Sequence, residues 1–222
     1  MSATSDAPPL STRRAYTAAE ERLHCASHGF GALGTLVCMA YLLPAAARHG
    51  AGSLLACAVY GLTILLMFVS STAYHAAPAH NVALKRRLRA VDHATIFLVI
   101  AGTYTAFASS LLGGWVGHAV LAAMWVLCGF GIYGVWRRGA QVHGPILPSF
   151  AMGTLVVLTV PQLAHSLAPD GVVLFVAGAA IYALGVPFYV LRRWPHHHGI
   201  WHAFVLAASL THFYAIAVFV VP

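Results

Sequence analysis

The sequence predicts an all-α integral membrane protein with seven transmembrane helices. Three observations support this prediction: the composition, the long apolar runs and the distribution of charge. Hydrophobic residues make up 60% of the 222 residues and charged residues only 8%, whereas a soluble domain carries about 25% charged residues. The mean hydropathy is +0.79. Such a chain has room for six or seven spans of about 20 residues and for little else.

Seven apolar runs have the length of a helix that crosses a bilayer. They fall at residues 24–47, 52–77, 91–112, 115–136, 146–166, 170–191 and 199–221. Turn residues or charges separate them, including a basic loop that we expect at 78–89, and the weakest break is Gly113-Gly114. We therefore expect residues 1–20 to form a polar tail and residues 21–222 to form one seven-helix domain.

The basic residues predict the orientation of these helices. Eleven of the twelve Lys and Arg residues precede the first run or lie at 85–89, 137–138 and 192–193, and only Arg48 falls on the opposite side. Because cytoplasmic segments collect Lys and Arg, we expect a cytoplasmic N-terminus and an external C-terminus in the cell membrane. The same rule accounts for the net charge of +7. We thus expect membrane lipids as partners and no nucleic acid.

A possible metal site lies where the last span begins. His198 and His202 are four residues apart, so on a helix both imidazoles lie on one face and can bind one ion. The predicted topology brings His75, at the end of the second span, and Asp92, at the start of the third, to the same depth near the cytoplasmic face. A catalytic zinc site usually keeps three protein ligands and one open position, and these three histidines would supply them.

Two further residues suit chemistry at such a site. Asp92 could hold a metal-bound water or accept its proton, although pairing with Arg89 at a cytoplasmic rim is an equally simple interpretation. Ser71, one turn before His75, could bond to a ligand or to a bound carbonyl, but serines also bond commonly between membrane helices. The triplet His196-His197-His198 has the alternative of being only a polar loop.

The sequence also predicts where several other polar residues lie. Glu21, His24 and His28 share one face at the start of the first span, at the level of the predicted site, so a polar cluster is expected there. His212 lies about 15 Å of helix rise beyond His202. It is therefore too distant for the same ion, and we expect it to make a hydrogen bond in the middle of the membrane.

Three separated motifs resemble the haemolysin III branch of the progestin and adipoQ receptor family. They are the run from Ser70 to His75, the run from Val91 to Ile96 with Ala101 to Thr105, and the run from His198 to His202 with Thr211 to Phe213. The resemblance implies a seven-helix membrane protein with zinc near the cytoplasmic side. It also implies that His75, His198 and His202 hold the zinc, with Asp92 close to the metal water.

One position departs from the family pattern. The family's first motif has a glutamate, an asparagine three residues later and a histidine four beyond that, whereas this chain has Glu21, His24 and His28. We interpret all three as residues that support the ligands from behind. An altered or additional ligand set that includes His24 is the alternative.

The leading functional prediction is a zinc-dependent hydrolase of amide-linked lipids, because the resemblance implies ceramide hydrolysis. Asp92 would act as the base and Ser71 would assist. One alternative is a non-enzymatic regulator of the membrane, or a pore-like haemolysin, in which zinc only joins helices. Another is a haem protein with iron between intramembrane histidines.

Overall fold

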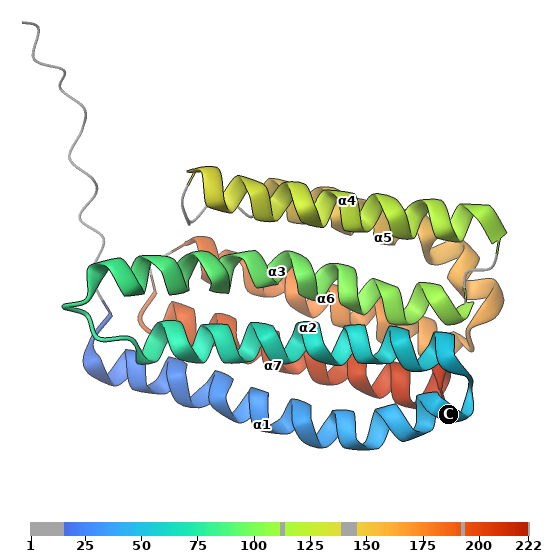
Figure 1. Ribbon diagram of the computed structural model, residues 1–222, viewed down its shortest axis with the longest axis horizontal. Coiled ribbons are helices and arrows are strands. Elements are labelled where there is room, and N and C mark those ends of the chain that lie inside the picture. Colours follow the sequence, from blue (N-terminus) through green and yellow to red (C-terminus); the bar gives the residue numbers. More distant parts are fainter. Residues whose placement is uncertain (1–15, 112–113, 139–145, 192–193, 222) are drawn as a thin grey trace, which may run out of the picture.

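The computed structural model describes residues 16–111, 114–138, 146–191 and 194–221, and these residues form seven long α-helices (Figure 1). They are α1 (Ala18–Arg48), α2 (Ala51–Ala76), α3 (Val82–Leu111), α4 (Gly114–Arg138), α5 (Ile146–Ser166), α6 (Pro169–Val190) and α7 (His197–Ala215), and α7 continues as the π-helical turn η1 (Ile216–Val220). All seven are long and apolar enough to span a membrane. The prediction of a seven-helix, multi-pass membrane protein is confirmed. The expected breaks at 113, 139–145 and 192–193 lie outside the described residues.

Two helices begin earlier than the apolar runs indicated. α1 begins at Ala18, after a capping box in which the Thr17 hydroxyl accepts from the Glu20 amide at 3.2 Å and the Glu20 carboxylate accepts from the Thr17 amide at 2.8 Å. α3 begins at Val82. The expectation of a basic loop at 78–89 is therefore wrong for most of that segment, because charged residues can extend a helix beyond its apolar part.

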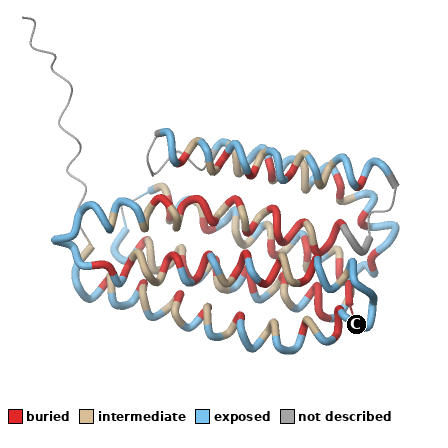
Figure 2. The backbone as a smooth tube through the Cα atoms, in the orientation of Figure 1, coloured by how far each residue is buried: buried red, intermediate tan, exposed pale blue. Residues whose placement is uncertain are grey.

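The helices are arranged in three tiers (Figure 1). α4 and α5 lie along one side, α3 and α6 form the middle, and α1, α2 and α7 form the other side. α3 packs against α2, α4, α5 and η1, and 72% of its apolar window is buried, the largest share of any span. Figure 2 shows this as a nearly continuous buried stripe. α3 is thus the central helix, and what it carries at its start lies against several neighbours.

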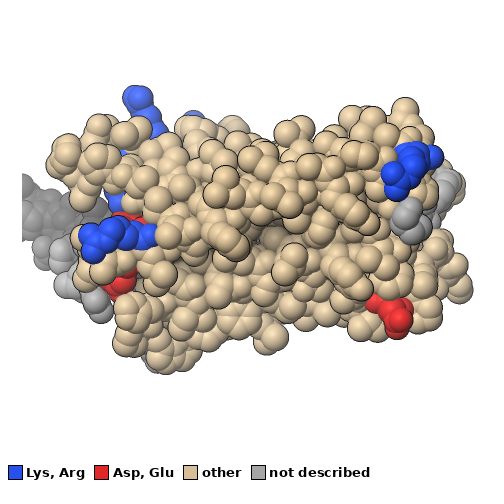
Figure 3. Space-filling model, turned by 90° about the horizontal axis from the view of Figure 1, so that it is seen from below, with Lys and Arg blue, Asp and Glu red and all other residues tan. Residues whose placement is uncertain are grey.

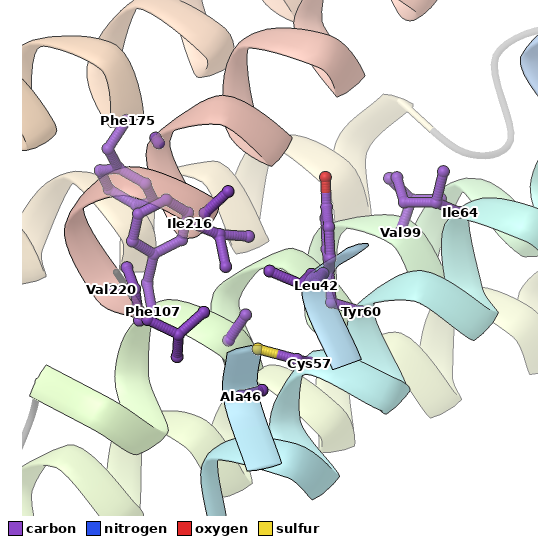
Figure 4. Close-up of a cluster of buried hydrophobic side chains, with 14 of the residues drawn as sticks. Leu42, Ala46, Cys57, Tyr60, Ile64, Val99, Phe107, Phe175, Ile216 and Val220 are labelled. Carbon is purple, nitrogen blue, oxygen red and sulfur yellow. The ribbon is translucent and has the colours of Figure 1, made fainter. Parts of the chain in front are cut away.

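The main apolar core joins the helices of the two lower tiers. Leu42 of α1, Tyr60 of α2 and Phe107 of α3 lie in one buried cluster with Phe175 of α6 and Ile216 of η1 (Figure 4). A second cluster joins α3 to α4 and α5. Between helices in a bilayer, close packing contributes more than burial from water, because lipid is as apolar as the core. These contacts fix the helix ends relative to one another, and the polar site lies at one such end.

The outer surface is apolar, as expected for a surface that contacts lipid. Large side chains such as Phe30, Val37 and Phe130 are 67–74% exposed. Figure 3 shows charged side chains only at the two ends of the face it views, with an uncharged belt between them. In water such a surface would aggregate, so its extent supports the membrane assignment.

Candidate metal centre

Five histidines from three helices meet at the end of the bundle opposite the C-terminus (Figure 1). They are His24 and His28 of α1, His75 of α2, and His198 and His202 of α7. All except His198 are at most 3% exposed. The up-and-down topology produces this cluster, since α1, α3 and α7 begin at the end of the bundle where α2 finishes. The expected polar cluster at this level is present.

Two of the predicted ligands approach each other closely. The Nε2 atoms of His75 and His198 are 3.2 Å apart. Zinc–nitrogen bonds are about 2.0–2.1 Å long, so two ligands of a tetrahedral zinc ion have nitrogens about 3.3–3.4 Å apart. The separation of these two imidazoles therefore fits joint binding of one ion.

A third imidazole completes a possible ligand group. Ligand atoms of His24, His75 and His198 all lie within 4.8 Å of one another, so these residues could hold a metal ion. The sequence placed His24 behind the ligands, but the structure brings it into direct reach. His202 lies close by, with ring centroids 4.7 Å from His198 and 5.2 Å from His75. Whether His24 or His202 joins His75 and His198 stays a prediction.

Glu21 orients His75. Its carboxylate accepts a hydrogen bond from His75 Nδ1 at 2.6 Å, and its other oxygen accepts from Lys85 Nζ at 2.6 Å. Lys85 also lies 5.2 Å from the centre of the Tyr74 ring. A carboxylate that holds Nδ1–H fixes the tautomer, so the lone pair of His75 Nε2 points to the site. The hydrogen bond fits the supporting role that the sequence predicted for Glu21, and that role stays a prediction. Lys85 had been assigned only to a basic loop.

Ser27 orients His202 in the same way, and sequence reasoning missed it. The Ser27 hydroxyl donates to the His24 carbonyl at 2.9 Å. Its oxygen lies 2.9 Å from His202 Nδ1, and because its proton is already used, it accepts from that nitrogen. The lone pair of His202 is then on Nε2. Position 27 shares a helix face with positions 24 and 28, and that spacing could have revealed it.

The α1 histidines lack conventional partners. Among the residues that the structure describes, none forms a hydrogen bond with either ring nitrogen of His24 or His28, although all four atoms are buried. The His28 ring stacks on His202 with centroids 3.5 Å apart. Buried polar atoms nearly always have a partner, so this donor set fits a bound metal or water better than an apolar core.

Asp92 lies near one member of the cluster, His75. Ser71, His75 and Arg89 all lie close enough to the Asp92 carboxylate to act on it electrostatically. Ser71 is 2% exposed and Asp92 is partly buried. Ser71 therefore lies near the acid, and the Arg89 interaction that we considered coexists with proximity to His75.

Tyr16 covers the cluster from the end of the bundle. Its ring stacks on His198 at 5.2 Å and meets His24 edge-on at 4.9 Å, measured between centroids. It directly precedes the capping box of α1, a position that gave no signal in the sequence. His197 instead bonds the Phe188 carbonyl at 2.9 Å, so within the histidine triplet only His198 joins the metal group.

His212 has the role that the sequence predicted. Its Nε2 lies 3.0 Å from the carbonyl oxygen of Phe175, and its side chain is buried in the middle of the bundle. It is a hydrogen-bonding residue between α7 and α6, and it belongs to no metal group in the part of the chain that the structure describes.

Comparison with known proteins identifies the family of this chain. The profile of haemolysin-III related proteins matches residues 16–213. Hemolysin-3 of Bacillus cereus is 32% identical over 213 residues, covering 95% of this chain and 96% of its own. The Hemolysin-3 homolog of Bacillus subtilis (strain 168) is 33% identical over 205 residues, covering 90% and 94%. The human monocyte to macrophage differentiation factor is 27% identical over 167 residues, covering 71% and 67%. The chain belongs to the haemolysin-III related family.

Proposed function

We propose that this protein is a zinc-dependent hydrolase of amide-linked membrane lipids, with its site near the cytoplasmic face. The observation that carries the proposal is the 3.2 Å separation of His75 Nε2 and His198 Nε2, with the Asp92 carboxylate close to His75. Bound zinc would polarise an amide carbonyl and activate a water molecule. The remaining chemistry falls to side chains of this chain.

Asp92 is the proposed general base. It takes a proton from the attacking water as the new C–O bond forms, and it delivers that proton to the nitrogen as the C–N bond breaks. The products are a fatty acid and an amine. The Ser71 hydroxyl keeps the carboxylate in position, and Glu21 keeps His75 in the tautomer that leaves Nε2 free.

The second candidate is a non-enzymatic membrane protein in which zinc joins α1, α2 and α7. Four imidazoles, His24, His75, His198 and His202, have neighbouring ring centroids 4.7–5.2 Å apart. If all four bound one ion, no position would remain for water, as in structural zinc sites. The Bacillus relatives carry haemolysin names, which also favours a membrane-perturbing or regulatory role.

The substitution Asp92→Asn separates the two candidates. For a hydrolase, the variant should keep most of its zinc while fatty-acid release from ceramide-like lipids falls by about 10²- to 10⁴-fold. Zinc is measured by elemental analysis and fatty acid by mass spectrometry. Asp170→Asn, the same chemical change at the far end of the bundle, is the control and should behave as wild type.

Two other outcomes would argue against this proposal or against the role it gives to Asp92. Wild-type protein with full zinc that releases no fatty acid from a broad panel of lipid amides, relative to a metal-stripped sample, would exclude the hydrolase. Loss of zinc in Asp92→Asn would instead show that the carboxylate serves the ion itself.

A further inference from the structure

The Tyr16 ring lies against all three imidazoles of the group that could hold a metal ion. It stacks on His198, with ring centroids 5.2 Å apart and an interplanar angle of 24°. It meets His24 edge-on at 4.9 Å and lies 6.3 Å from His75. These three histidines come from α7, α1 and α2, respectively. One side chain therefore covers the place where three helices bring their ring nitrogens together.

The side of the group that faces the interior of the bundle is closed by protein. His24 and His75 are 1% and 3% exposed. Behind them lie His202, which is 1% exposed, and His28, which is 3% exposed. The His28 ring packs in turn against Phe68, with centroids 5.1 Å apart. The group is thus enclosed on its membrane side.

The side that faces the end of the bundle is more open. His198 and Tyr16 are both only partly buried, and the side chain of His196, the N-cap of α7, is 66% exposed. Figure 3 shows charged side chains at both ends of the bundle, as expected where the protein meets water. His198 is therefore the member of the group nearest to water, and the Tyr16 ring lies on it. An ion that arrives from the aqueous phase has to pass this ring.

Tyr16 is attached so that its ring can move without unfolding α1. It precedes Thr17, the N-cap of α1, whose backbone is extended, with φ −68° and ψ 161°. The capping box joins Thr17 to Glu20 through two hydrogen bonds, and these bonds keep the first turn of the helix in place. Rotation of the Tyr16 side chain would uncover His198 while the capping box stays intact. The ring is thus a movable cover and not a fixed part of the helix.

The contacts of the ring suit a cover that is mostly closed but opens readily. One aromatic pair shifts an equilibrium by about 2- to 10-fold. The closest pairs of Tyr16 are those with His24 and His198, so the covered state should predominate by about 4- to 100-fold. Rotation of a partly exposed side chain is fast compared with the release of a tightly bound metal ion.

We propose that Tyr16 is a gate that controls the passage of metal ions and water between the aqueous phase and the histidine cluster. The gate rests on the metal centre that both candidate functions share, and it does not depend on hydrolysis. An open ring exposes the imidazoles for loading, and a closed ring shields a bound ion from competing ligands in the water. Tyr16 thus sets the rates of exchange, whereas the imidazoles set the affinity.

Zinc exchange measured in both directions tests the gate. Full-length protein in nanodiscs is loaded with zinc and mixed with an excess of a chromogenic chelator, and metal-free protein is mixed with buffered zinc, both by stopped flow. Tyr16→Ala should accelerate release and uptake by a similar factor, about 4- to 100-fold, with little change in the dissociation constant. A ring that only supported the ligands would change the release rate and leave uptake as it is.

Two variants serve as controls. Tyr16→Phe keeps the ring and should exchange zinc as wild type does. Tyr41→Ala removes a ring from the same helix at a position that is 64% exposed, and it should leave both rates unchanged. If Tyr16→Ala does not fold, as judged by size-exclusion chromatography, Tyr16→Leu decides the result. Leucine presents no flat ring to His198, so both rates should still rise, by a smaller factor.

The outcomes separate the gate from the proposed function. Unchanged rates in Tyr16→Ala, or faster release with unchanged uptake, would overturn the gate even in a protein that releases fatty acid. Faster exchange in both directions, in a protein that hydrolyses no lipid amide, would retain the gate and exclude the hydrolase. Wild-type protein that takes up no zinc would contradict both.

Discussion

The Glu21 carboxylate and the His75 imidazole form a hydrogen bond of 2.6 Å between the start of α1 and the end of α2. Lys85 of α3 binds the other carboxylate oxygen at 2.6 Å. Three helices are thereby connected behind a single metal-ligand candidate. Through this contact α1 holds the imidazole of another helix in one orientation.

Glu21→Gln should weaken zinc binding by about 10- to 100-fold, the usual cost of removing a group that orients a ligand histidine. The amide keeps the shape of the side chain but removes the charge that stabilises Nδ1–H. Competition with a chelator of known affinity measures the change. Asp170→Asn, far from the site, should leave the affinity unchanged, and an unaltered affinity in Glu21→Gln would show that His75 needs no such support.

His75→Ala and His198→Ala should each reduce zinc from about one ion per chain to a small fraction, because removing one imidazole of three eliminates most of the affinity. Elemental analysis of purified protein gives the stoichiometry. His212→Ala removes an equally buried histidine that bonds Phe175 and should retain zinc. Full zinc in both test variants would mean that the 3.2 Å contact is not a binding site.

His24→Ala and His202→Ala distinguish the two possible ligand sets. Loss of zinc in His202→Ala alone would support the set that the family resemblance implies. A comparable loss in His24→Ala would make the α1 histidine a ligand in this chain, as the proximity of His24, His75 and His198 permits. Large losses in both would indicate a closed site of four imidazoles and would favour the structural role of zinc.

Reporter fusions test the predicted orientation. A reporter after Pro222 should be active only outside the cytoplasm, and one fused directly after Arg138 should be active only inside. Neutralising Arg86 and Arg87, which are exposed, should weaken this orientation without breaking the Lys85–Glu21 pair. The reverse pattern of reporter activity would contradict both the charge argument and the cytoplasmic position of the site.

The positions of the helix starts show one limit of prediction from hydropathy. Apolar runs indicate which residues cross the bilayer, but α1 and α3 continue beyond them, to Ala18 and Val82. The Thr17-to-Glu20 spacing is a capping-box signal that would have placed the start of α1 correctly. α3 carried no comparable signal within its basic cluster.

The sequence by itself determined the seven spans, because bilayer thickness fixes the length of an apolar helix, and it determined that His75, Asp92 and His198 share one end of the bundle. Only the tertiary structure decided which side chains touch. Helices that are apolar on all sides do not reveal which face is internal, since lipid and protein interior are equally apolar. Contacts such as Glu21 with Lys85, or Ser27 with His202, depend on how each helix is rotated about its axis, and packing against its neighbours sets that rotation.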